Sequence, residues 1–132
     1  TGIGQREHIL IPKNVKHFRE RRHSIELGNL DVVRDISDIR FVVEVYRRLL
    51  ECNDHSNGQT LNICSGQAVK LMQLIEIMCE LAGYDIEIKV NPEFVRSNDI
   101  KRLVGSDSKL RSLIGTPPVY TIRETLSSMY HA

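Results

Sequence analysis

The sequence predicts a mixed α/β fold, because segments with helical periodicity alternate with short β-prone runs. Residues 38–51 place apolar side chains at helical spacing, and residues 69–83 form a second, strongly apolar helical segment. Residues 85–90 alternate apolar and charged side chains, as a half-buried strand does. With 132 residues, the chain fits one small domain.

The first predicted element is a short basic amphipathic helix from about residue 9 to residue 22, with Pro12 in its first turn. Its basic side chains form either a solvated face or a surface for an anion or a partner; they are Lys13, Lys16, Arg19, Arg21 and Arg22. Two short extended segments follow, at residues 24–27 and 32–37. They flank Gly28-Asn29, a dipeptide suited to a turn.

The middle of the chain is predicted as a helix, a loop and a strand. We expect the helix at 38–51 to bury one stripe of six residues: Ile39, Val42, Val43, Tyr46, Leu49 and Leu50. The polar segment 52–59 contains a turn at Asn57-Gly58. Residues 60–64 form a compact β-prone run that ends at Ser65-Gly66.

The last part of the chain is predicted to contain the apolar helix, a strand and two further helices. The helix at 69–83 is expected to end at Gly83, and its inward residues are expected to be Leu71, Leu74, Ile75, Met78 and Leu81. The strand at 84–90 should point Ile86, Ile88 and Val90 inward. After Pro92 we expect a polar loop, a short helix near 108–114 and a last helix at about 121–130.

Composition excludes several classes of function. The 18 basic and 17 acidic residues nearly balance, so no overall field favours nucleic acid or an anionic membrane. Three widely spaced cysteines and five scattered histidines suggest neither a disulfide framework, a zinc site nor any other metal site, and they fit a reducing cytoplasm. No apolar run approaches the roughly 20 residues of a membrane span, and no signal peptide is evident. The absence of an initiator methionine suggests a fragment or a processed chain.

The candidate chemistry lies in loops. The opening TGIGQRE cannot be a dinucleotide loop, because Glu7 stands where the third glycine is needed. No G-x-S-x-G elbow indicates a nucleophile. Arg34, ahead of a helix, and the loop with Arg96 and Asp99 suit a phosphorylated small molecule, since guanidinium groups grip phosphates and a carboxylate accepts from sugar hydroxyls. The alternative is that each arginine is a surface charge or a structural ion pair with Asp35, Asp38 or Asp99.

Four segments carry a resemblance to a known family: TGIGQ, LGNLDVVRDISDIRFVV, LNICSG and VRSNDIKRLVGSDSKL. In this order they resemble the C-terminal part of extended short-chain dehydrogenase/reductases acting on nucleotide sugars. The nearest likeness is to GDP-4-keto-6-deoxy-D-mannose reductases and GDP-mannose 4,6-dehydratases, and UDP-sugar 4-epimerases share a looser pattern. The resemblance implies a small mixed α/β substrate-binding domain at 1–132, with the last Rossmann-type strand and helices.

The resemblance also implies roles for individual residues. Gly28 and Asn29 would line the nucleotide pocket, Arg34 would contact the diphosphate or nucleotide, Arg96 would grip the diphosphate, and Asp99 would hold a ribose hydroxyl. The family's cofactor glycine loop and its Y-x-x-x-K catalytic pair lie upstream, and neither motif occurs here. The chain would therefore hold no catalytic, cofactor-binding or metal-binding residue, and NADP or NAD would bind in the parent protein.

Three departures from the family pattern stand out. Ser97 replaces the proline after the loop arginine, Lys70 replaces a serine or threonine helix cap, and the tryptophan after Gly115 is missing. The expected partners are a nucleotide sugar and either the missing Rossmann half or a second copy, because the run at 60–64 would lack a neighbouring strand. The alternatives are a non-enzymatic nucleotide-binding module and a module that binds partners through its basic helix.

Overall fold

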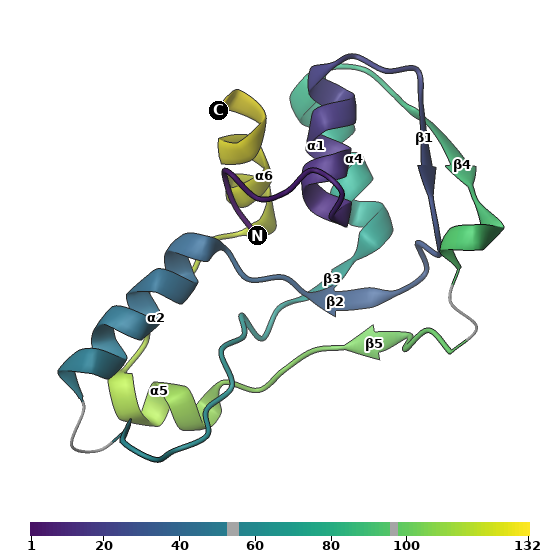
Figure 1. Ribbon diagram of the computed structural model, residues 1–132. Helices are drawn as coiled ribbons and strands as arrows, with labels where there is room; N and C mark the ends of the chain where they lie inside the picture. The colour runs from purple at the N-terminus through teal and green to yellow at the C-terminus, as the bar shows by residue number, and fades with distance from the viewer. Residues whose placement is uncertain (53–55, 96–97) are drawn as a thin grey trace.

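The computed structural model describes residues 1–52, 56–95 and 98–132 and confirms a mixed α/β fold (Figure 1). The elements, in chain order, are α1 (Leu10–Arg19), β1 (Ser24–Leu27), β2 (Val33–Asp35), α2 (Ile39–Glu51), β3 (Ala68–Lys70), α4 (Leu71–Ala82), β4 (Glu87–Val90), the 3-10 turn η1 (Pro92–Phe94), β5 (Arg102–Leu103), α5 (Ser108–Ile114) and α6 (Ile122–His131). None of the described helices has both the length and the apolarity to cross a membrane.

The strands form two small sheets. β1 pairs with β4 in parallel, with Ser24 opposite Glu87 and Leu27 opposite Val90. β2 lies between β3, which is antiparallel to it, and β5, which is parallel. β2 therefore connects two segments that are distant in the sequence, and it carries the candidate residue Arg34 at the centre of its three residues.

The main core lies where α1, α4 and α6 pack together and against β1 (Figure 1). Its most enclosed members are at most 1% exposed: Phe18, Ile25, Val32, Leu74, Met78 and Leu126. The predicted inward face of α4 is confirmed, with Leu81 partly buried. Gly83 ends this helix at a φ of +71°, a conformation that glycine adopts without steric cost.

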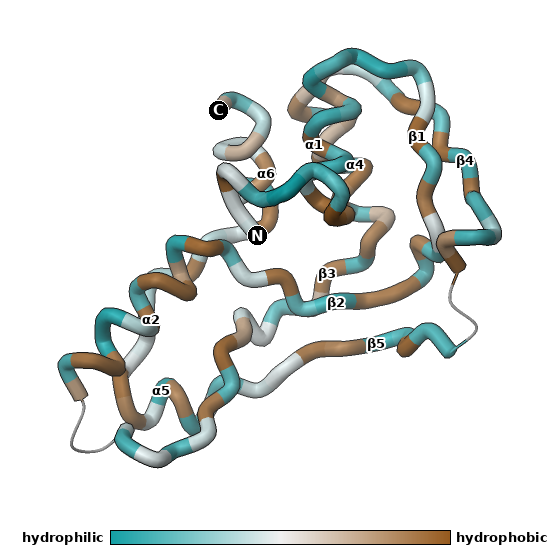
Figure 2. Tube along the Cα trace, in the orientation of Figure 1, coloured by the Kyte–Doolittle hydropathy of each residue, from teal (hydrophilic) through white to brown (hydrophobic). Residues whose placement is uncertain are grey.

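A smaller apolar cluster joins α2 to α5, and it corrects the predicted stripe of α2. The buried residues of the cluster are Phe41, Val45, Leu110 and Ile114, with Val42 and Leu49 partly buried. Four members of the predicted stripe are exposed instead: Ile39, Val43, Tyr46 and Leu50. The helix is apolar on more than one face, and only the face toward α5 is covered in the described chain (Figure 2).

Three further expectations are corrected. The first helix ends at Arg19 rather than residue 22, because Arg21 takes a positive φ of 50° that breaks the helical run. The β-prone run at 60–64 is in no strand, because no other described strand runs beside it, and β3 forms at 68–70. In β4, Val90 is 64% exposed rather than inward, since its two-stranded sheet leaves one face uncovered at that end.

Candidate functional site

A cavity of about 560 Å³ brings together four of the five predicted site residues. Gly28 and Asn29 enter it from the end of β1, Arg34 from β2, and Asp99 from the loop before β5. Arg96, like Ser97, lies outside the described residues. Convergence of segments this far apart in the chain was implied by the family resemblance but could not be derived from any one motif.

Gly28 is required by a close approach of two backbones. A Cβ atom at this position would lie 2.4 Å from the carbonyl oxygen of Phe94 in η1. Asn29 holds the following turn, because its side-chain oxygen accepts a hydrogen bond of 2.9 Å from the backbone N–H of Asp31. The turn expected at this dipeptide is therefore present, and it seats η1 against the end of β1.

Arg34 and Asp99 form an ion pair. Nη2 of Arg34 donates to Oδ1 of Asp99 at 2.6 Å, and the two side chains are 25% and 21% exposed. Nη1 donates to the carbonyl oxygens of Ile100, at 2.6 Å, and Val33, at 2.9 Å. The structural ion pair considered from the sequence is thus the arrangement that Arg34 adopts, with Asp99 as its partner.

Asp35, the next residue along β2, binds backbone groups on the opposite face of the strand. Its Oδ1 accepts from the N–H of Ser65 at 2.8 Å and from the hydroxyl of Ser65 at 2.7 Å. Its Oδ2 accepts from the N–H of Gly66 at 2.8 Å and, at 3.4 Å, from that of Gly105. Sequence reasoning missed this role, although the R-D and S-G dipeptides that carry it were both noted.

Lys13 and Phe94 form another wall of the cavity. Nζ of Lys13 donates to the carbonyl oxygen of Glu26 at 2.8 Å and lies 4.9 Å from the centre of the Phe94 ring. The Phe94 ring belongs to η1, whose start is capped by Asn91. Asn91 also donates to the carboxylate of Glu26 at 3.2 Å. Sequence reasoning counted Lys13 only as part of a basic cluster.

Asp38 fixes the start of α2, outside the lining of this cavity. Its carboxylate accepts hydrogen bonds from the backbone N–H and the guanidinium of Arg40, and from the Thr125 hydroxyl of α6 at 2.7 Å. Burial alone would raise the pKa of Asp38, but these hydrogen bonds, together with the charge of Arg40, lower it from 3.8 to about 2. The guanidinium of Arg40 in turn lies 4.1 Å from the centre of the Tyr120 ring.

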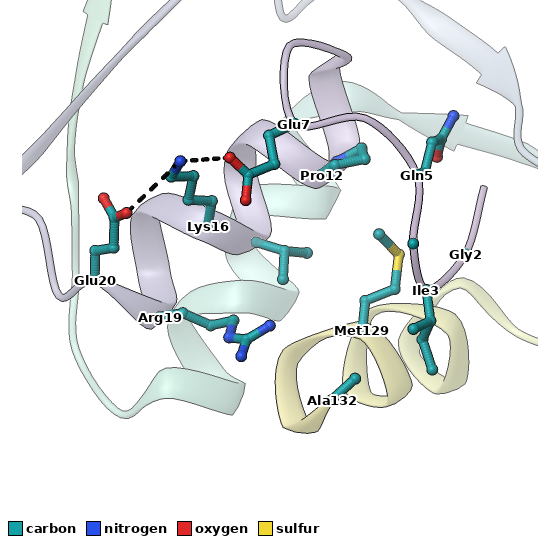
Figure 3. A pocket seen from close by; sticks show the side chains of 12 residues that line it. Gly2, Ile3, Gln5, Glu7, Pro12, Lys16, Arg19, Glu20, Met129 and Ala132 are labelled. Atoms are coloured by element: carbon teal, nitrogen blue, oxygen red, sulfur yellow. Dashed lines mark hydrogen bonds and ion pairs between the residues drawn. The ribbon is translucent and has the colours of Figure 1, made fainter.

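A second cavity, of about 630 Å³, contains none of the predicted site residues. Figure 3 shows it between residues 2–7, α1 and the end of α6, with Arg19 pointing from α1 toward α6. Gly2 is needed for packing rather than for a phosphate, since a Cβ there would lie 2.3 Å from Cγ2 of Ile39. This contact gives Gly2 a packing role against the start of α2.

Two of the five basic residues in and just after α1 pair with carboxylates, and a third lies over an aromatic ring. Lys16 binds Glu7 and, at 3.9 Å, Glu20, as the dashed lines in Figure 3 mark. Arg22 binds Glu20 at 2.6 Å, and the guanidinium of Arg21 lies 5.0 Å from the centre of the Tyr84 ring. These contacts favour the interpretation of Lys16, Arg21 and Arg22 as ordinary surface charges.

No family model matches the chain, but individual relatives do. A GDP-6-deoxy-D-talose 4-dehydrogenase of Aggregatibacter actinomycetemcomitans is 36% identical over 130 residues, which make up 98% of this chain and 44% of that protein. A GDP-6-deoxy-D-mannose reductase of Pseudomonas aeruginosa is 30% identical over 133 residues, covering 97% of this chain and 43% of the relative. The chain therefore spans less than half the length of these curated relatives.

Solved structures agree with the sequence relatives. A candidate epimerase of Burkholderia cenocepacia J2315 matches 99% of this chain and 43% of its own, with a TM-score of 0.95 and 42% identity. RMD of Pseudomonas aeruginosa, complexed with NADPH, matches 98% of this chain and 44% of its own, with a TM-score of 0.88 and 29% identity. The chain belongs to the extended short-chain dehydrogenase/reductases, the NAD-dependent epimerase/dehydratase family, and corresponds to the C-terminal portion of these relatives.

Proposed function

We propose that this chain is the nucleotide-sugar-binding part of an NAD(P)-dependent oxidoreductase or dehydratase that acts on a GDP-linked deoxyhexose. The observation that carries the proposal is the convergence of Gly28, Asn29, Arg34 and Asp99 on one cavity. Two curated relatives named for GDP-6-deoxyhexose chemistry support the choice of the base and the sugar class. Residues 1–132 act as one substrate-binding unit in this proposal.

Each of the four residues that line the cavity has a role that fits its place there. Gly28 and Asn29 line the nucleotide pocket with backbone groups, and Asp99 accepts a hydrogen bond from a ribose hydroxyl. Arg34 holds Asp99 and the carbonyl of Ile100, so it orients the ribose-binding carboxylate from behind. Arg96 grips the diphosphate, for which the forked guanidinium is well suited.

Hydride transfer requires groups that these 132 residues do not contain. Neither a Y-x-x-x-K pair nor a complete dinucleotide glycine loop occurs in the sequence, so the chain alone is catalytically incomplete in this proposal. NADP or NAD binds to the other portion of the parent protein, which acts in the cytoplasm. The NADPH in the structure of RMD supports a nicotinamide cofactor for the parent.

The chain needs a partner to cover its apolar surface. The exposed face of α2 carries Ile39, Val43, Tyr46 and Leu50, and the β-prone run at 60–64 follows it without a neighbouring strand in the described chain. We propose that the Rossmann half of the parent covers both, and that the isolated chain associates with itself instead. Light scattering at increasing concentration should give a mass above 15.1 kDa; a monomer at every concentration would contradict this.

Calorimetric titration with GDP, UDP and dTDP tests the binding role. We expect saturable binding of GDP that Arg96→Ala weakens at least tenfold, because a charge-assisted bidentate contact is lost. Arg123→Ala is the matched control, since this arginine of α6 is exposed, pairs with Glu80 and lies outside the cavity. Equal weakening by both variants, or no binding of any nucleotide by the chain and by the chain joined to its Rossmann half, would refute the proposal.

The two alternative modules make different predictions. A basic-helix module would bind anionic partners with an affinity that falls steeply with salt and ignores the base. A non-enzymatic nucleotide-binding module would bind GDP in the same way, but the parent protein would lack the glycine loop and the Y-x-x-x-K pair. Reading the parent's coding sequence upstream of residue 1 separates that module from an enzyme.

A further inference from the structure

We propose that Lys13 of α1 is the residue of the described cavity that binds the phosphates of the nucleotide, and that Phe94 positions its ammonium group. The inference rests on the proposed function and extends it to a residue that neither the motifs nor the resemblance singled out. It follows from the charges that line the cavity and from how each of them is already used.

The residues that line the cavity include more carboxylates than permanent cations. Three carboxylates line it, those of Glu26, Glu93 and Asp99, against the permanent cations of Lys13 and Arg34. The guanidinium of Arg34 is committed to the carboxylate of Asp99. A nucleoside diphosphate adds at least two further negative charges, and an uncompensated anion beside carboxylates would be repelled.

Lys13 is the lining cation whose positive charge is not neutralised by an acidic partner in the described chain. Its ammonium donates to a neutral carbonyl oxygen, that of Glu26, at 2.8 Å. An ammonium group carries three N–H donors, so contact with one carbonyl leaves donors for phosphate oxygens. Lys16, one turn later on the same helix, differs in this respect because it pairs with Glu7 and Glu20.

Phe94 holds the ammonium in place before a ligand arrives. The ammonium lies 4.9 Å from the centre of the Phe94 ring, within the range of a cation–π contact. The backbone that carries the ring is held in place, because the carbonyl group of Phe94 packs directly on Gly28 and the Asn91 side chain caps η1. A lysine whose ammonium group is already held by two contacts loses less conformational entropy when it binds an anion.

Calorimetry with GDP and with guanosine tests the inference on the full 132-residue chain. Lys13→Gln should weaken GDP binding about tenfold, which is about 1.4 kcal/mol, and should leave guanosine binding within twofold, because only GDP carries phosphates. It should also flatten the dependence of the GDP affinity on salt. Lys16→Gln removes the same charge from the same helix outside this cavity and should change both affinities less than twofold.

A charge-conserving variant and a check of the fold separate loss of charge from loss of structure. Lys13→Arg keeps a cation and should retain most of the GDP affinity, while circular dichroism of each variant verifies that the fold is intact. If the unsubstituted chain binds GDP and Lys13→Gln binds it equally well, the role of Lys13 is overturned and the proposed function stands. Equal losses for GDP and guanosine would also overturn the role of Lys13. Binding of neither ligand by the unsubstituted chain, alone and joined to its Rossmann half, would refute the proposed function and this inference together.

Discussion

The carboxylate of Asp38 should stabilise the fold by an amount that depends on pH. It is 2% exposed and accepts hydrogen bonds from Arg40 and from Thr125, which links α2 to α6. Its pKa of about 2, against 3.8 for an ordinary aspartate, corresponds to about 2 kcal/mol of stability at neutral pH. Asp38→Asn keeps a helix cap but removes the charge, so this pH-dependent contribution is lost.

The sign follows from the lowered pKa. Because the folded carboxyl binds its proton less readily than the unfolded one, the stabilisation is complete above about pH 5 and shrinks as pH falls through 3.8 toward 2. We expect urea unfolding, followed by circular dichroism, to show that the unsubstituted chain has a higher free energy of unfolding than Asp38→Asn. This difference should be about 1 kcal/mol larger at pH 7 than at pH 3. Thr125→Val removes one donor to the carboxylate, so the difference in free energy of unfolding between the unsubstituted chain and this variant should also be larger at pH 7 than at pH 3, but by less than for Asp38→Asn.

One result would refute the reasoning about Asp38. If the free energies of unfolding of the parent chain and Asp38→Asn run parallel from pH 7 to pH 3, the carboxylate contributes nothing that depends on its charge. A difference in free energy of unfolding that is the same at every pH would not support the role of the charge, because loss of packing or of the helix cap also produces such a difference. The pH-dependent part alone reports the interactions with Arg40 and Thr125.

Three further substitutions probe the cavity and its supports, each measured by urea unfolding and GDP calorimetry. Gly28→Ala should cost about 2 kcal/mol and weaken GDP binding, because its Cβ would meet the Phe94 carbonyl oxygen at 2.4 Å; wild-type values would refute the close packing. Arg34→Lys should lower the free energy of unfolding by about 1 kcal/mol, since an ammonium cannot make the three hydrogen bonds of the guanidinium. Adding Asp99→Ala to Arg34→Lys should then lower it little further; if the losses of the two single variants simply add in the double variant, the pairing is contradicted. Asp35→Asn should lower the free energy of unfolding by about 2 kcal/mol, because an amide NH2 group would face a backbone N–H that now donates to a carboxylate oxygen. An unchanged free energy of unfolding would contradict the observed hydrogen bonds.

The sequence predicted a helix end or a turn correctly where the conformational preference of a single residue determines it. Gly83 ends α4 because only glycine takes its φ of +71° cheaply, and this could be inferred from the sequence alone. The turn at Gly28-Asn29 was likewise visible from residue types. The convergence of Gly28 and Asp99 was available only from the family resemblance, because contacts across more than 60 residues leave no trace in local periodicity.

The exposed face of α2 shows where periodicity is insufficient. Apolar residues at i, i+3 and i+4 from Ile39 predicted one buried stripe, yet Phe41 and Val45 on a different face make the contact with α5. A helix with apolar side chains on two faces does not say which of them packs within the described chain. The relatives are more than twice as long as this chain, which is why the proposal assigns the second face to the remainder of the parent.

The R-D dipeptide of β2 shows how two neighbouring residues of a short motif take separate structural roles. Neighbouring residues of a strand point to opposite faces, so Arg34 reaches Asp99 while Asp35 reaches Ser65 and Gly66. These partners lie 65 and 30 or more residues along the chain. One three-residue strand thereby fixes two loops at once. Of these two loops, the one with Asp99 lines the cavity, whereas the one with Ser65 and Gly66 lies outside its lining, so the two charges of the dipeptide support the fold in different places.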